Sequence, residues 1–101
     1  MPRQDTDASS EFRIFETEEF QKKLGKLPVR ELRFIRQKLT DYVYPQLRID
    51  PFLGQNIKKL KGYQPATWRY RIGKFRLFFL VDTKDRIVAM LSVDDRRDAY
   101  R

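Results

Sequence analysis

The sequence predicts an α+β fold, in which an N-terminal strand and a helical hairpin pack on a twisted antiparallel sheet of three to five strands. Three observations predict it. Apolar residues recur at helical spacing between positions 17 and 44, and in strand-like runs from position 57 onward. The pair Gly73-Lys74 separates two of these runs, as the link of a β-hairpin does. The length of 101 residues suits one domain with one core.

The first half of the chain begins with a polar stretch at 1–10, which we expect to be a disordered tail ahead of a single domain at 11–101. A strand is expected at 11–16, where Phe12 and Ile14 alternate with Arg13 and Phe15. Thr17 is expected to cap a first helix, because its hydroxyl can accept a hydrogen bond from an N–H of the first turn.

A second helix is expected from about 28 to 44, where Pro28 suits its first position. Its apolar stripe consists of Leu32, Ile35, Leu39, Tyr42 and Val43. Residues 45–56 hold two prolines and a glycine, so we expect an irregular connection there.

The second half predicts antiparallel sheet, with strands at 57–61, 67–72, 75–82 and 86–93. The strand at 75–82 is apolar on both faces, so we expect it to be central and covered on both sides. Residues 94–101 are polar and are expected to form a short tail with a helical turn.

The amino-acid composition limits which reacting groups and which partners the protein can have. The chain has no cysteine and no histidine, so we expect neither a metal site nor a cofactor, and reacting groups must come from Lys, Arg, Tyr, Asp, Glu or hydroxyls. Lys and Arg total 22 against 14 Asp and Glu, a net charge of +8 that favours polyanionic partners. No apolar run is long enough to span a membrane and the first ten residues lack a signal-peptide core, so we expect a cytoplasmic protein.

The positive charge is concentrated in one segment. Between Pro51 and Val81 there is no Asp or Glu, and seven basic residues cannot pair within the segment: Lys58, Lys59, Lys61, Arg69, Arg71, Lys74 and Arg76. A surface that repels itself in this way indicates a partner that neutralises it, and we expect a nucleic-acid backbone.

The alternation of side chains along a strand assigns these basic residues to one or the other face of the expected sheet. Arg69 and Arg71 are two apart and share one face, while Trp68, Tyr70 and Ile72 face the helices. Arg76, after the hairpin link, is a cross-strand neighbour of Arg69 or Arg71. Because opposed like charges destabilise a sheet, their presence indicates a function.

Three motifs, in this order and spacing, resemble the RelE/ParE superfamily of type II toxin–antitoxin toxins: K-K-L-K-G at 58–62, W-R-Y-R-I-G-K-F-R at 68–76 and R-R-D-A-Y at 96–100. The similarity spans 11–101. It implies the fold already expected, and an antitoxin partner that we expect to cover the basic strands and the groove beside the hairpin with an acidic, amphipathic segment. RelE-like members are metal-independent endoribonucleases that cut mRNA in the ribosomal A site, whereas ParE-like members poison DNA gyrase.

The resemblance assigns roles to residues of this chain. It implies a catalytic set of Arg69, Arg71, Arg76, Arg96 and Tyr100, and we expect RNA-binding roles for Lys58, Lys59, Lys61, Lys74 and Arg97. Retention of this set favours a nuclease that acts on ribosome-bound mRNA over a gyrase poison. A nucleic-acid-binding module without catalysis is a third hypothesis.

The chain departs from the pattern at two places. Many relatives carry lysine on the 69/71 strand, where this chain has two arginines, and some carry His or Lys just before the C-terminal arginine, where this chain has Asp94 and Asp95. Arginine is a poor general base, so Tyr100 and Asp95 are the candidates for that role.

Overall fold

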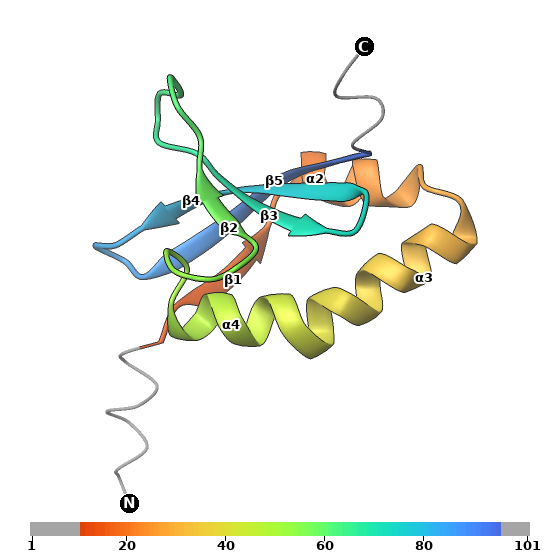
Figure 1. Ribbon diagram of the computed structural model, residues 1–101, viewed down its shortest axis with the longest axis horizontal. Coiled ribbons are helices and arrows are strands. Elements are labelled where there is room, and N and C mark those ends of the chain that lie inside the picture. The colour runs from red at the N-terminus through yellow and green to blue at the C-terminus, as the bar shows by residue number, and fades with distance from the viewer. Residues whose placement is uncertain (1–10, 96–101) are drawn as a thin grey trace, which may run out of the picture.

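The structure, a computed structural model, describes residues 11–95 as a five-stranded sheet with a helical hairpin on one face (Figure 1). The strands lie in the spatial order β1-β5-β4-β3-β2. Their bounds are β1 (Arg13–Glu16), β2 (Ile57–Lys59), β3 (Trp68–Ile72), β4 (Phe75–Asp82) and β5 (Ile87–Asp95). The α+β fold class and the expected strands are thereby confirmed, with shifts of one or two residues at their ends.

One pairing departs from the expected antiparallel sheet. Strand β1 runs parallel to β5, with Ile14 opposite Val88, whereas the other three pairings are antiparallel. Only strands joined by a short turn are obliged to be antiparallel, and β1 is followed by the helical hairpin instead. The sheet is therefore mixed.

Strand β5 also differs from expectation at its C-terminal end. It continues to Asp95, so the first two residues of the expected polar tail belong to the sheet. The expected helical turn further on, like the tail at 1–10, lies outside the described residues.

The hairpin consists of α2 (Glu18–Gly25) and a longer helical segment made of α3 (Val29–Lys38), the π-helical turn η1 (Leu39–Val43) and α4 (Tyr44–Ile49). Thr17 caps α2 as expected, because its Oγ1 accepts from the Phe20 N–H at 3.2 Å. The same hydroxyl donates to the Met90 carbonyl at 2.8 Å, which fastens the start of α2 to β5. No helix within residues 11–95 is long and apolar enough to cross a membrane.

The second helix passes through Pro45, where we expected an irregular connection. Proline has no N–H and its ring collides with the carbonyl four residues earlier, so it normally ends a regular α-helix. Here the Tyr44 N–H donates to the Leu39 carbonyl, five residues back. This wider turn accommodates the proline, and helix α4 continues to Ile49.

The π-turn also decides which side chains face the core. Ile35, Leu39, Val43 and Leu47 are spaced four apart, a spacing that drifts around a regular helix. The wider turn corrects that drift, and all four are buried. Tyr42, expected in the apolar stripe, is instead 60% exposed.

The core lies between the helical hairpin and one face of the sheet. Helical side chains such as Phe20 and Ile35 cluster there with alternate residues of the strands, among them Tyr70, Leu77 and Phe79. Strand β4 is central as expected, but its second face is not covered by any element of residues 11–95: Arg76, Phe78 and Leu80 are only half-buried. This second face of the sheet is called the open face below.

A charged network ties β1 to the second helix. Arg36 donates to both carboxylate oxygens of Glu16, with Nη1–Oε2 at 2.7 Å and Nη2–Oε1 at 3.2 Å, and the Tyr44 hydroxyl also donates to Oε2. Burial raises the pKa of Glu16, but these hydrogen bonds outweigh it, so that the pKa lies below its ordinary value of 4.5. The pKa of Tyr44 is raised, first by burial and then by its bond to Glu16.

We expect the Glu16→Gln variant to lose about 1–2 kcal/mol of unfolding free energy at pH 7, because it loses charge-assisted hydrogen bonds of which one end is solvent-exposed. The folded-state pKa of Glu16 is depressed, so its stabilising contribution is present above about pH 4.5 and fades as the pH falls through the folded-state value. Urea unfolding at pH 7 and pH 3 measures both effects. The exposed Glu11→Gln change is the control, and a Glu16→Gln deficit of equal size at both pH values would contradict this account.

Candidate functional site

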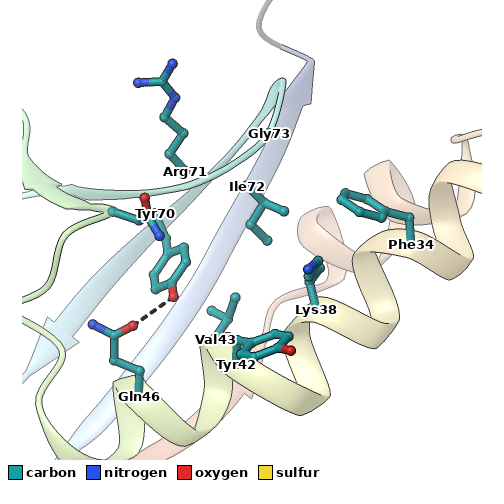
Figure 2. Close-up of a pocket in the computed structure, with 10 residues that line it drawn as sticks. Phe34, Lys38, Tyr42, Val43, Gln46, Tyr70, Arg71, Ile72 and Gly73 are labelled. Carbon is teal, nitrogen blue, oxygen red and sulfur yellow. Dashed lines mark hydrogen bonds between the residues drawn. The ribbon is translucent and has the colours of Figure 1, made fainter.

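Three of the predicted catalytic arginines lie on the open face of the sheet. In the hairpin of β3 and β4, Arg71 is directly opposite Arg76, and Arg69 is opposite Phe78. Tyr70 and Ile72 of the same strand point to the core and are buried. Figure 2 shows the Arg71 side chain extending away from the side on which Tyr70 and Ile72 lie. The expected split of strand 68–72 and the expected Arg71–Arg76 neighbours are thus seen in the register.

The open face continues from these arginines in two directions. On β2, Lys58 is opposite Arg69, which extends the positive charge towards the edge of the sheet. On β5, Asp94 is opposite Arg76, and it also lies 3.4 Å from Lys23 Nζ. Among residues 11–95, neither Lys58 nor Arg71 takes part in an ion pair. Lys58 and Arg71 are therefore the two cations of this surface whose charge no carboxylate of residues 11–95 pairs with.

The other predicted RNA-binding lysines lie elsewhere. Lys59 is opposite Trp68 on the helix side of the sheet, with its Nζ 5.9 Å from the centre of the indole. Lys74, in the β3–β4 turn, pairs with Glu31 at 2.8 Å and with Asp95 at 3.4 Å. The segment's lack of acids therefore does not leave Lys74 uncompensated, because both carboxylates come from other parts of the chain. Lys61 lies in the loop between β2 and β3 and is exposed.

The C-terminal members of the predicted site, Arg96, Arg97 and Tyr100, lie outside the described residues. The chain reaches them from Asp95, which is opposite Phe75, at the same end of the sheet as Arg71 and Arg76. Phe75 belongs to the core, so Asp95 faces the helices and pairs with Lys74, away from the open face. Of the two candidate bases, Asp95 is thus directed to the opposite side of the sheet from the arginines.

The chemistry that this surface can support is that of phosphate binding. Guanidinium groups are planar and bind phosphate oxygens in a bidentate manner, and two of them project from directly paired positions of a rigid hairpin. Gly73, with a φ of +55°, makes the tight link that sets this pairing. Within residues 11–95 no three carboxylates gather in a way that could hold a metal ion.

A groove of about 640 Å³ runs between the second helix and β3. A groove beside the helical hairpin was expected, but the residues that line it were not. Figure 2 shows Phe34, Lys38 and Tyr42 on its helical wall, with Tyr70, Ile72 and Gly73 on the opposite wall. Phe34 is 42% exposed, and Lys38 Nζ lies 5.7 Å from its ring centre and 4.8 Å from that of Tyr42. The one sequence signal was Phe34 itself, an aromatic residue outside the stripe of the second helix.

The groove also borders an open strand edge. Strand β2 pairs with β3 only from Trp68 to Tyr70, and the Arg71 N–H donates to the Asn56 carbonyl at 3.0 Å. Beyond that point, towards Ile72 and Gly73, no strand of residues 11–95 adjoins this side of β3. An exposed edge beside an apolar wall is a site at which another chain can add a strand or a helix.

The fold is similar to those of solved toxins. The toxin–antitoxin complex RelBE2 from Mycobacterium tuberculosis matches with a TM-score of 0.68 and 26% identity over 85% of this chain and 99% of that one. The RelE–RelB complex from Pyrococcus horikoshii matches with a TM-score of 0.63 and 23% identity, over 84% and 94% of the two chains. A free mutant of the Escherichia coli toxin RelE gives 0.62 and 20%, over 89% and 88%. No family model and no curated protein sequence matches this chain.

These similarities show that the chain has the RelE toxin fold. They extend over nearly the whole of the matched toxins, so the likeness is that of complete domains. The resemblance inferred from the sequence motifs is confirmed at the level of the fold.

Proposed function

We propose that this protein is the toxin of a type II toxin–antitoxin system and that it cleaves mRNA in the ribosomal A site. The observation that carries the proposal is the pairing of Arg71 with Arg76 on an open sheet face that Arg69 and Lys58 extend. The fold shared with RelE toxins supports the toxin assignment, because some of those toxins were solved with their antitoxins.

The proposed reaction uses the substrate's own nucleophile. The 2′-OH of one nucleotide attacks the adjacent phosphorus, a base removes the 2′-OH proton, and an acid protonates the departing 5′-oxygen. Charge accumulates on the non-bridging phosphate oxygens in the transition state, and Arg71 and Arg76 are placed to stabilise it. Arg96 is proposed to add a third cation, and Tyr100 to act as the base or to stack on the substrate base.

Translation with purified ribosomes and a defined A-site codon, followed by primer extension, tests the proposal. We expect a cut within the A-site codon when the protein is added without antitoxin at low salt. If the protein inhibits DNA supercoiling by gyrase and makes no cut in the mRNA, the nuclease proposal is wrong and the gyrase-poison hypothesis is supported.

We further propose that the antitoxin binds in the groove between α3 and β3. Aromatic side chains on one wall offer apolar contact area, and the Lys38 ammonium lies over both rings. An acidic, amphipathic segment matches both features, because its apolar side chains can cover the rings while its carboxylates approach Lys38.

A further inference from the structure

The loop between β2 and β3, residues 60–67, carries an unexplained concentration of exposed side chains. It is closed at its base by a hydrogen bond from the Leu60 N–H to the Thr67 carbonyl at 2.9 Å, and Thr67 is buried. Residues 61–66 between these anchors are all exposed. In Figure 1 this loop projects beyond the rest of the sheet, far from the helical hairpin. An exposed loop on a rigid base is a common location for binding residues.

The side chains of the loop surround a hollow. Its volume is about 510 Å³, and Lys59, Lys61, Tyr63 and Gln64 are among the residues that line it. Tyr63 is 53% exposed, although aromatic rings are usually among the more buried side chains. Neither lysine forms an ion pair with any residue from 11 to 95. The hollow is thus basic and aromatic. The indole of Trp68, the single tryptophan of the chain, lies under Lys59.

We propose that this hollow binds one unpaired nucleotide of the RNA substrate, at a distance from the bond that is cut. Tyr63 stacks on the base, Lys59 and Lys61 contact the flanking phosphates, and the Gln64 amide hydrogen-bonds the base edge. Stacking on an aromatic ring between cations is the general mode by which proteins hold single-stranded nucleic acid. The inference rests on the proposed function, because it names a second contact for the same substrate.

The geometry of the sheet connects this hollow to the arginine pair. Trp68 begins β3 directly after the loop, and Arg71 lies three residues further on, about 10 Å along the strand. Lys58 and Arg69, paired on the open face, lie between them. Because Lys59 lies on the helix side of the sheet, a strand of RNA that leaves the hollow rounds the edge strand β2 to Lys58 on the open face before it reaches Arg71 and Arg76. Holding a distant nucleotide in this way fixes the register of the phosphate that is attacked.

The test measures binding of a fluorescein-labelled 12-nucleotide single-stranded RNA of mixed sequence, by anisotropy and without ribosomes. We expect Tyr63→Ala to raise the Kd about 5- to 100-fold, and Tyr63→Phe to leave it within about twofold because the ring remains. We expect Lys61→Gln to lower the slope of log Kd against log salt concentration by about 0.7, the value for one lost phosphate contact on a single strand.

Matched controls separate the loop from general effects of charge and exposure. Phe15→Ala removes a comparably exposed aromatic ring from β1, and Lys84→Gln removes an exposed lysine from the β4–β5 turn. Both should bind the RNA as the wild type does. Wild-type Kd and salt slope in Tyr63→Ala and Lys61→Gln would overturn the inference, as would equal losses in the two controls.

Failure of this inference can be told from failure of the proposed function. If the wild type binds the RNA through Tyr63 but does not cut A-site mRNA, only the nuclease proposal falls. If the wild type cuts A-site mRNA and Tyr63→Ala cuts it with unchanged kcat/KM, only the loop contact falls.

Discussion

The Arg71→Gln variant is expected to cleave A-site mRNA at least about 100-fold more slowly than the wild type. Removing one preorganised group that stabilises developing charge typically costs a factor of 10²–10³ in rate. Arg71 projects from the open face opposite Arg76, so glutamine at this position leaves a single guanidinium on the hairpin. We expect the double change Arg71→Gln, Arg76→Gln to reduce the rate further. Primer extension on programmed ribosomes measures both rates.

The same substitution should not destabilise the protein. Directly opposed like charges on neighbouring strands are unfavourable, so removing one of them should leave the unfolding free energy unchanged or raise it by a few tenths of a kcal/mol. If Arg71 serves the reaction and not the fold, its substitution should reduce activity while the unfolding free energy stays the same or rises. Urea unfolding of the purified variant supplies this second measurement.

Arg13→Gln is the matched control for Arg71→Gln. Arg13 is also an exposed arginine on a strand of this sheet, and it lies on β1 at the opposite edge from β2. It removes the same charge, so it should reduce the non-specific attraction to RNA equally while leaving cleavage within a few-fold of the wild type. Equal rates for Arg71→Gln and Arg13→Gln would show that net charge, and not the arginine pair, governs the reaction.

Local patterns sufficed to predict the hairpin of β3 and β4 and the placement of its arginines. Alternation along 68–72 separates Arg69 and Arg71 from Tyr70, and Gly73 marks the turn, so spacing limits the neighbour of Arg76 to Arg69 or Arg71. The register of the structure selects Arg71. The Thr17 cap was predictable for the same reason, because its partner lies only three residues away. Features that depend on contacts between residues close in sequence, or across one tight turn, can be predicted from a single sequence.

Features that depend on distant contacts were not predictable in this way. The parallel pairing of β1 with β5 and the ion pairs of Lys74 with Glu31 and Asp95 join parts of the chain that no local pattern relates. The π-turn is a different case. Pro45 predicted the end of the helix, and the Tyr44 hydrogen bond that lets the helix continue has no sequence signature. That turn exposes Tyr42, so the aromatic wall of the groove was not predictable, although a groove beside the hairpin was expected.

The groove yields the second large effect. We expect the double variant Phe34→Ala, Tyr42→Ala to bind the antitoxin about 100-fold or more weakly than the wild type, because each aromatic anchor truncated at an interface can cost 2 kcal/mol or more. Phe34 and Tyr42 are both substantially exposed, so their truncation should leave the core intact. Titration calorimetry with the cognate antitoxin measures the affinity.

The variant should separate neutralisation from toxicity. The Phe34 and Tyr42 rings lie on the helical wall of the groove, whereas Arg71, which also borders the groove, extends its side chain away from those rings (Figure 2). Ribosome-dependent cleavage by the double variant should therefore match that of the wild type, while co-expressed antitoxin no longer protects cells. Tyr63→Ala, which truncates a similarly exposed tyrosine on the β2–β3 loop, should retain antitoxin binding and so serves as the control. Full neutralisation of the groove variant would place the antitoxin elsewhere, with the basic strands β2 and β3 as the next surface to test, because an acidic segment bound there would block Arg71 directly.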